Sequence, residues 1–113
     1  MLDVKPEVYR ALCRALSEDS VFFVAPEEAA RLPCISYLEL NNVPEGLGDD
    51  GEYSSTVEIA VDIWGDTSVQ VDAAAQAVDR EMTAEGFMRT YATDIPPDGG
   101  NLCHKNMRYT ITI

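Results

Sequence analysis

The spacing of apolar residues changes once within the stretch VEIAVDIWGDTSVQVDAAAQAVDREM, residues 57–82. Before Gly65 the apolar residues alternate with other residues, as in a strand whose two faces differ. One face carries Val57, Ile59, Val61 and Ile63, and the other carries Glu58, Ala60, Asp62 and Trp64. The stretch therefore predicts a strand at about 53–64, long enough to project beyond its domain. It also places two carboxylates and a tryptophan on the face turned away from the core.

Two helices are predicted from apolar residues that recur every three or four positions. In the first helix, at about 6–16, the predicted buried stripe is Tyr9, Leu12, Cys13 and Leu16. In the second, which follows Gly65, it is Val71, Ala74, Ala75, Val78 and Met82. Asp66 or Ser68 is the expected N-cap of the second helix, and Gly86 is its expected stop.

The remaining strands are predicted at 21–25, 34–40, 87–95 and 103–113, and the stretch 27–32 favours a single helical turn. In the last strand, one face carries Met107, Tyr109, Ile111 and Ile113. The simplest packing of these elements is an α+β fold, with two helices on one face of a mainly antiparallel sheet of about five strands. A chain of 113 residues predicts a single domain, residues 1–113.

Between two of these strands lies NNVPEGLGDDGE, residues 41–52, with three glycines, one proline and four acidic residues. Such a composition predicts a long flexible loop, and loops of this length in small domains are commonly functional or disordered. The acids do not have the spacing of a calcium-binding loop.

Charge narrows the classes of partner. The hydrophobic content of 46% and charged content of 25% are ordinary for a globular protein, but the formal net charge is −12. With only eight Lys and Arg residues, the chain is a poor match for a nucleic-acid backbone or an anionic membrane. No apolar run is long enough to span a bilayer, and MLDVKPEVYR lacks the layout of a secretory signal, so we expect a soluble intracellular protein with no membrane partner.

Residue types that carry chemistry are sparse. We expect Cys13, Cys34 and Cys103 to be reduced and packed among apolar neighbours. Cys103 and His104 are adjacent in a predicted strand, so their side chains point to opposite faces and are badly placed to share a metal ion. His104 is the single histidine, and no glycine pattern precedes a helix in the way a phosphate site requires. The sequence predicts no enzyme, no metal site and no cofactor.

The polar face of the strand at 53–64 has two interpretations. It is an ordinary solvated sheet face, or it contacts neighbouring copies of the same chain. Closed rings place one surface repeatedly around an axis. An acidic lining in such a ring repels phosphate, so that DNA passes through the lumen without specific binding.

The chain resembles the tail terminator (tail completion, or head–tail joining) proteins of long-tailed bacteriophages. The resemblance rests on ISYLELNN, the glycine and acid loop, EYSSTVEIAVDIWGD, VDAAAQAVDREMTAEGFMRTYATDI and the closing HKNMRYTITI. It covers about Val4 to Ile113. Its individual marks are Glu39-Leu40-Asn41-Asn42, Val61-Asp62-Ile63-Trp64, Met82 with Gly86-Phe87, and Arg108-Tyr109.

The resemblance implies a structural virion protein of a phage or prophage, made in the host bacterial cytoplasm and located at the head-proximal end of the tail. Such proteins form a ring, typically a hexamer, that ends the tail tube and joins it to the head. The implied partners are other copies of the chain, the major tail tube protein and the head connector protein. From the residues themselves, our candidates for the ring interface or lumen are Asn42, Glu45, Asp49, Asp50, Glu52, Glu58 and Asp62.

Two alternatives remain open at this stage. The chain is a head–tail connector or another tail-assembly protein, or it is an acidic intracellular regulator that mimics nucleic acid and blocks a basic partner. Acids scattered over loop, helices and strands disfavour a mimic, which needs carboxylates spaced like phosphates on one surface.

Overall fold

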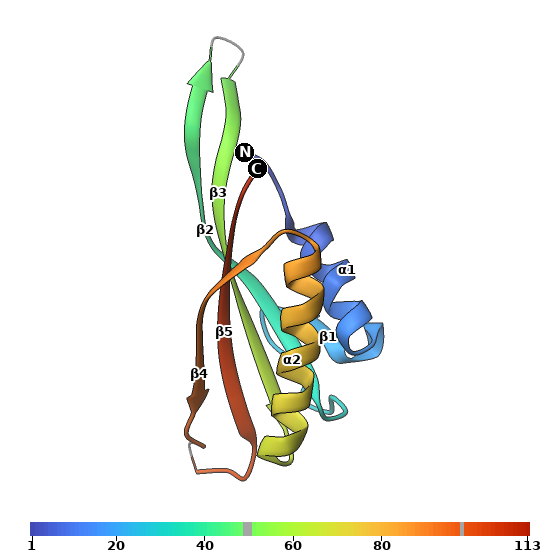
Figure 1. The fold of residues 1–113 in the computed structure, drawn as a ribbon. Coiled ribbons are helices and arrows are strands. Elements are labelled where there is room, and N and C mark those ends of the chain that lie inside the picture. Colours follow the sequence, from blue (N-terminus) through green and yellow to red (C-terminus); the bar gives the residue numbers. More distant parts are fainter. Residues whose placement is uncertain (49–50, 98) are drawn as a thin grey trace.

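The computed structural model describes residues 1–48, 51–97 and 99–113, with side chains described except at 46–48 and 51–53. Two helices pack on one face of a five-stranded sheet (Figure 1). The elements in chain order are α1 (Lys5–Ala15), a short 3-10 turn (Glu18–Ser20), β1 (Val21–Phe23), β2 (Cys34–Gly48), β3 (Gly51–Gly65), α2 (Ser68–Ala84), β4 (Met88–Ile95) and β5 (Cys103–Thr112).

The strands lie in the order β1-β2-β3-β5-β4. The β1–β2 pair is parallel, and the other three pairs are antiparallel. This confirms the predicted α+β class with a mainly antiparallel sheet. No helix in the described part of the chain is long and apolar enough to cross a membrane.

The core lies between the helices and the inner face of the sheet. The four predicted inward residues of β3, namely Val57, Ile59, Val61 and Ile63, are fully buried. All five residues of the predicted α2 stripe are buried too. Two of the five are alanines, and such small side chains let a helix lie close to a sheet.

The predicted stripe of α1 is wrong in part. Leu12 is buried as expected, but Tyr9 is exposed, and the other fully buried residues of the helix are Val8 and Ala11. The reason is that α1 packs more against α2 than against the sheet. Ala11 is fully buried, and Tyr9 lies beside the Tyr37 ring with 6.3 Å between centroids.

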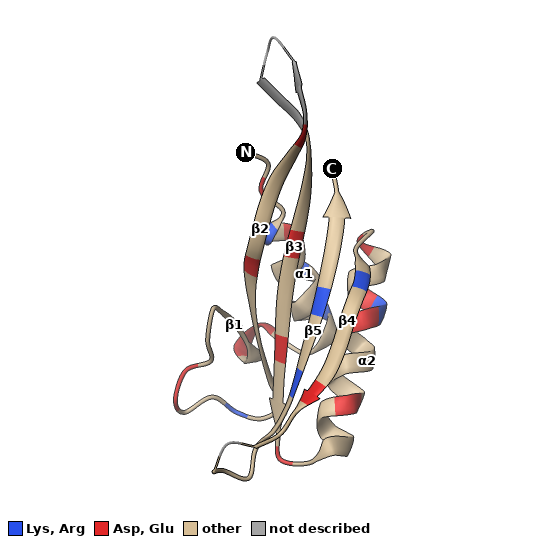
Figure 2. Ribbon diagram, turned by 90° about the vertical axis from the view of Figure 1, so that its left-hand side faces the viewer, with Lys and Arg blue, Asp and Glu red and all other residues tan. Residues whose placement is uncertain are grey.

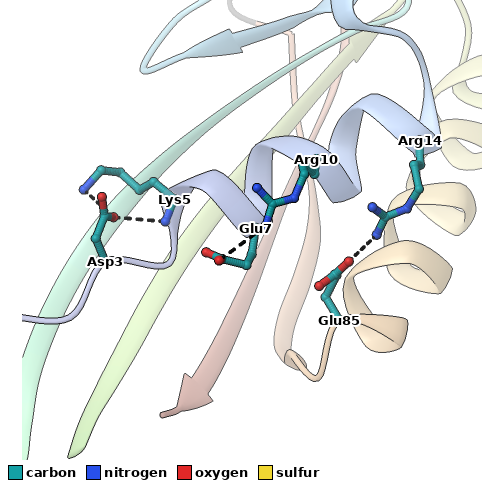
Figure 3. Close-up of polar contacts among 6 residues, drawn as sticks. All are labelled: Asp3, Lys5, Glu7, Arg10, Arg14 and Glu85. Carbon is teal, nitrogen blue, oxygen red and sulfur yellow. Dashed lines mark hydrogen bonds and ion pairs between the residues drawn. The ribbon is translucent and has the colours of Figure 1, made fainter. Parts of the chain in front are cut away.

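Ion pairs line the α1 side of the molecule (Figure 3). Arg14 links the two helices through Glu85 at 2.6 Å and Glu81 at 3.6 Å, and its hydrogen bond to Glu85 raises the pKa of the guanidinium. Lys5 pairs with Asp3 and Arg10 with Glu7. The basic residues of α1 are therefore occupied by acids of the same chain.

The ends of α2 follow local sequence rules. Thr67, rather than the predicted Asp66 or Ser68, is the N-cap: its Oγ1 accepts a hydrogen bond from the Gln70 N–H at 3.1 Å. The Gln70 side chain in turn accepts from the Asp66 N–H at 2.6 Å, an arrangement close to a capping box. At the other end Gly86 has φ +97, and the Gly86 and Phe87 N–H groups bond back to Thr83 and Met82. This is a Schellman end, and it confirms Gly86 as the stop.

The range 41–52, predicted as a loop, is instead part of a long β-hairpin wherever the structure describes it. Strands β2 and β3 pair as far as Gly48 and Gly51, with register shifts near Leu40 and Glu45. Such bulges let a strand continue through a stretch that contains proline and glycine.

The end of this hairpin extends past the rest of the fold (Figure 1). β5 accompanies β3 only as far as the Thr56–Thr112 pair, followed by backbone hydrogen bonds between Ser55 and Ile113. We refer to residues 43–48 and 51–56 as the arm. The expected projection of the third strand is thus confirmed.

Two smaller predictions change near the N-terminal edge of the sheet. β1 covers only 21–23 of the predicted 21–25, because Val24 has φ +73 and turns the chain before Pro26. The stretch 27–32 forms no helix, although the Ala30 N–H bonds to the Glu27 carbonyl in a single turn. The bounds of β4 and β5 agree with the prediction to within one residue.

Candidate interaction surface

The face of the sheet opposite the helices is uncovered by any helix of the described residues (Figures 1 and 2). The register places Trp64 beside His104, Asp62 beside Asn106 and Glu58 beside Thr110 on this outer face. The polar face predicted for β3 is therefore the outer face of the whole sheet.

Asp62 is the centre of a compact polar cluster on the outer face. Its Oδ1 lies 2.8 Å from His104 Nε2 and accepts a hydrogen bond from Asn106 Nδ2 at 3.0 Å. The Trp64 ring stacks on the His104 ring, with 4.4 Å between centroids and 17° between planes. Both Asp62 and His104 are mostly buried. This aspartate joins β3 to β5, which makes it a structural residue as well as a candidate contact.

The cluster does not assemble a nucleophile and its base. Ser36 lies opposite Asp62 in the β2–β3 register, but its buried hydroxyl has no hydrogen-bond partner among the described residues. Cys103 points to the helix side of the sheet, away from His104, and burial raises the pKa of the Cys34 thiol. Within the described ranges, no three His, Cys, Asp or Glu side chains lie close enough together to hold a metal ion.

The remaining predicted site residues do not form one patch. Glu58 is on the outer face, with its Oε1 3.5 Å from Asn41 Nδ2. Asn42 points to the opposite face, where its Nδ2 donates to the Leu2 carbonyl at 2.6 Å and to Glu39 Oε1 at 3.2 Å. It therefore holds the N-terminal segment against β2.

The other four candidates belong to the end of the hairpin. Glu45 is exposed on β2. Glu52 lies in β3, where its side chain is not described, and Asp49 and Asp50 lie outside the described residues. The structure thus brings Glu58 and Asp62 together on one strand face and leaves the arm as a second, separate feature.

Acidic and basic residues are divided between the β2–β3 hairpin and the β4–β5 hairpin. This division is present in the sequence, but the predictions above do not include it. Residues 34–65 include no Lys or Arg and seven acidic residues: Glu39, Glu45, Asp49, Asp50, Glu52, Glu58 and Asp62. Strands β4 and β5 carry three basic residues, Arg89, Lys105 and Arg108, against the single acid Asp94. Figure 2 shows acids along β2 and β3, with basic residues beside them on β5 and β4.

On the helix side, an open groove of about 540 Å³ lies between α2 and strands β4 and β5. Its charges are already paired. Lys105 lies 3.1 Å from Asp94 and 3.2 Å from Asp72, and these hydrogen bonds raise the pKa of the ammonium group. Asp79 pairs with Arg89 at 3.2 Å and accepts from the Tyr109 hydroxyl at 2.9 Å. We assign these groups to holding α2 on the sheet.

Fold and surface together define an α+β protein with one uncovered sheet face and a projecting acidic hairpin. Neither a protein-family model nor a curated protein sequence matches the chain. Among solved structures, the chain is similar to one from the virion of a native gene transfer agent particle. The TM-score is 0.67 with 13% sequence identity, and the match covers 91% of this chain and 88% of that chain. At this identity the likeness establishes a shared fold.

Proposed function

We propose that the chain is a structural protein of a phage-like virion and that it assembles with other virion proteins. The observation that carries this proposal is the fold shared over nearly the whole chain with a component of a gene transfer agent virion. The outer face of the sheet supports the proposal, because no helix of the described residues covers it and it is free to contact other proteins.

In more detail, we propose a closed ring that ends the tail tube and joins it to the head. The sequence resemblance to tail terminators supports this role, and so does a hairpin of seven acids and no basic residue. The proposed ring is a hexamer with the acids of β3 facing its axis. These acids repel the phosphates of DNA, so that DNA passes through the ring without specific binding. The tail tube protein and the head connector are the partners on the two sides of the ring.

The experiment that tests this role is absolute mass by light scattering over a wide range of protein concentration, with negative-stain images of the largest species. A discrete ring-sized mass is expected. A dimer that never grows, or a monomer at every concentration, contradicts the ring. In the genome that carries the gene, its deletion should leave filled heads without tails, together with tail tubes that do not end at their normal length.

The nucleic-acid mimic is disfavoured by one contact. A mimic needs free carboxylates in a phosphate-like row, whereas Asp62 on β3 is bonded to His104 and Asn106. Of the two alternatives to a tail terminator, the head–tail connector agrees better with the structure than the nucleic-acid mimic does. Gene order separates a connector from a terminator, because a terminator gene normally lies just before the gene for the major tail protein.

A further inference from the structure

Two long strand edges of the sheet, one on β4 and one on β2, are open in the described part of the chain. β4 pairs with β5 on one side and with no described strand on the other. β1 covers β2 only at Ile35, Ser36 and Tyr37, so that from Leu38 onward the edge of β2 pairs with no described strand. Open edges present rows of backbone N–H and C=O groups that another strand can pair with.

The open edge on β4 has few of the features that protect edge strands. Its eight residues, MRTYATDI, include no proline and no lysine, and one irregularity lies between Arg89 and Tyr91. Met88 is 63% exposed and Tyr91 is 47% exposed. Monomeric proteins usually protect an edge of this length with charge, proline or a covering segment. The two charged residues of β4, Arg89 and Asp94, are already paired with Asp79 and Lys105. The exposed apolar side chains are thus left without a neighbouring free charge on this strand, which indicates an edge that is covered in the assembled state.

The hairpin of β2 and β3 presents the second open edge. Beyond the end of β5 the arm is a two-stranded ribbon, a structure that is marginally stable in water when nothing else supports it. Apolar side chains are exposed along β2, with Leu40 at 40% and Val43 at 50%. The register places Val43 on the outer face through its pairing with Thr56, and Tyr91 lies on the same face through its pairing with Arg108.

Charge identifies what these two edges fit. The hairpin of β2 and β3 has acidic residues and no basic ones. On β4 and β5, Arg89 and Lys105 are paired with acids of the same chain, so the charge that matters at this edge is that of Arg108. The Arg108 guanidinium lies over the Tyr91 ring, 5.2 Å from its centroid, and it has no ion pair among those found in the described residues. A positive charge therefore lies at the apolar centre of the β4 edge. An acidic, apolar strand edge complements it, and β2 of another copy is such an edge.

We propose that the open edge of β2, from Leu38 to Val43, pairs along β4 of a neighbouring copy, so that the sheet continues from one subunit to the next; Pro44, which has no backbone N–H, ends the pairing edge. This inference rests on the self-assembly in the proposed function, and it adds which surfaces meet. The two edges differ, so the contact is head-to-tail, and such contacts close into rings when the rotation between subunits allows it.

The test uses two double variants that disable one edge each. Met88→Glu with Tyr91→Glu places two acids on β4. These acids pair with Arg108 and repel the acidic strand of a neighbouring copy. Leu40→Gln with Val43→Gln removes the exposed apolar side chains from β2 without adding an acid that Arg108 would attract. Val69→Glu is the matched control, because Val69 is a strongly exposed aliphatic residue that belongs to α2 and to neither strand edge.

Each double variant is expected to need at least a tenfold higher concentration than the native chain to assemble, whereas the control assembles as the native chain does. An equimolar mixture of the two double variants is the decisive measurement. It supplies one intact β2 edge and one intact β4 edge, so light scattering should show a discrete dimer where each variant alone is a monomer.

The possible failures are distinct. If both variants keep the native ring mass, the edge pairing is wrong and the ring stands. If the mixture stays monomeric, the head-to-tail pairing is wrong. A native chain that never assembles overturns the ring and the pairing together. Should a variant fail to fold, hydrogen exchange on the native chain decides. The backbone amides of 38–43 and 88–95 that point away from β3 and β5 must exchange more slowly on assembly, and unchanged exchange of these amides overturns the pairing.

Discussion

The Tyr109 phenol shows how one polar group is fixed inside this core. The residue is fully buried, and its hydroxyl donates to Asp79, which also pairs with Arg89. Tyr109→Phe removes the hydroxyl donor, while the Asp79 carboxylate keeps its ion pair with Arg89. We therefore expect a loss of about 1.5 kcal/mol in the free energy of unfolding, measured in urea. Tyr91→Phe, at an exposed tyrosine, should change it by less than about 0.5 kcal/mol. Equal effects would contradict the assigned hydrogen bond.

The same phenol predicts a pH dependence. Burial, with the hydrogen bond to Asp79, raises the pKa of Tyr109 above its ordinary value of 10.0. A raised pKa in the folded state contributes stability that is complete below pH 10.0 and is lost as the pH rises further, because the unfolded chain ionises first. The stability difference between the native chain and Tyr109→Phe should therefore shrink between about pH 10 and 11. A difference that is constant over this range would refute the assignment.

Gly65 illustrates a packing limit at the junction of β3 and α2. An added Cβ would lie 2.7 Å from Gln70 Oε1 and 2.9 Å from Val71 Cγ2, and Val71 is buried. Gly65→Ala should therefore destabilise the fold by about 1–3 kcal/mol, the usual cost of overpacking. Gly100→Ala, where nothing lies within 4 Å, is the control and should be close to neutral. Thermal or urea unfolding of the pair distinguishes the two sites.

At the scale of elements, the N-terminus of α2 depends on Thr67. Thr67→Ala should lower the free energy of unfolding by about 1 kcal/mol, because the Gln70 N–H loses its acceptor. Ser68→Ala lies one residue further on, inside the helix, and should have little effect. The reverse order in urea unfolding would show that Ser68 is the cap, one of the two residues, Asp66 and Ser68, that the sequence predicts.

The elements also show what the sequence determined and what it did not. Alternation at 57–64 and the alanine stripe of α2 were predicted correctly because a half-buried strand and an amphipathic helix carry their own periodicity. The arm was missed because its glycines, proline and acids have the composition of a loop. Residues 41–48 form a strand because they pair with the antiparallel strand β3, and the register of that pairing depends on tertiary structure and not on local sequence.

The candidate site was partly predictable for the same reason. Period-two alternation placed Glu58, Asp62 and Trp64 on the outer face, as the structure shows. The pairing of Asp62 with His104 joins residues 42 positions apart, and no local pattern encodes it. Asn42 was grouped with the acids from its position in the supposed loop, yet the register shift near Leu40 turns it to the helix side.

For the whole molecule, the expected passage of DNA predicts the effect of charge reversal at Glu58. Unlike Asp62, its carboxylate has a single long contact among the described residues, with Asn41, so Glu58→Lys should leave the fold intact. The assembled variant should retain DNA in a gel-shift assay at low salt and release it as salt rises, because added lysines contact phosphate. Glu27→Lys, in the exposed segment between β1 and β2, is the control. If the two variants retain DNA equally, Glu58 does not line the lumen.

The separation of charge between the hairpins has a practical consequence for protease mapping. No Lys or Arg lies between Arg31 and Arg80, so trypsin yields β2, β3 and most of α2 as one peptide from Leu32 to Arg80, whether or not the arm is accessible. A glutamate-specific protease has sites in this range at Glu39, Glu45, Glu52 and Glu58. Digestion with the two enzymes in parallel therefore separates the arm from the rest of the chain, and the glutamate-specific fragments report when the arm becomes covered.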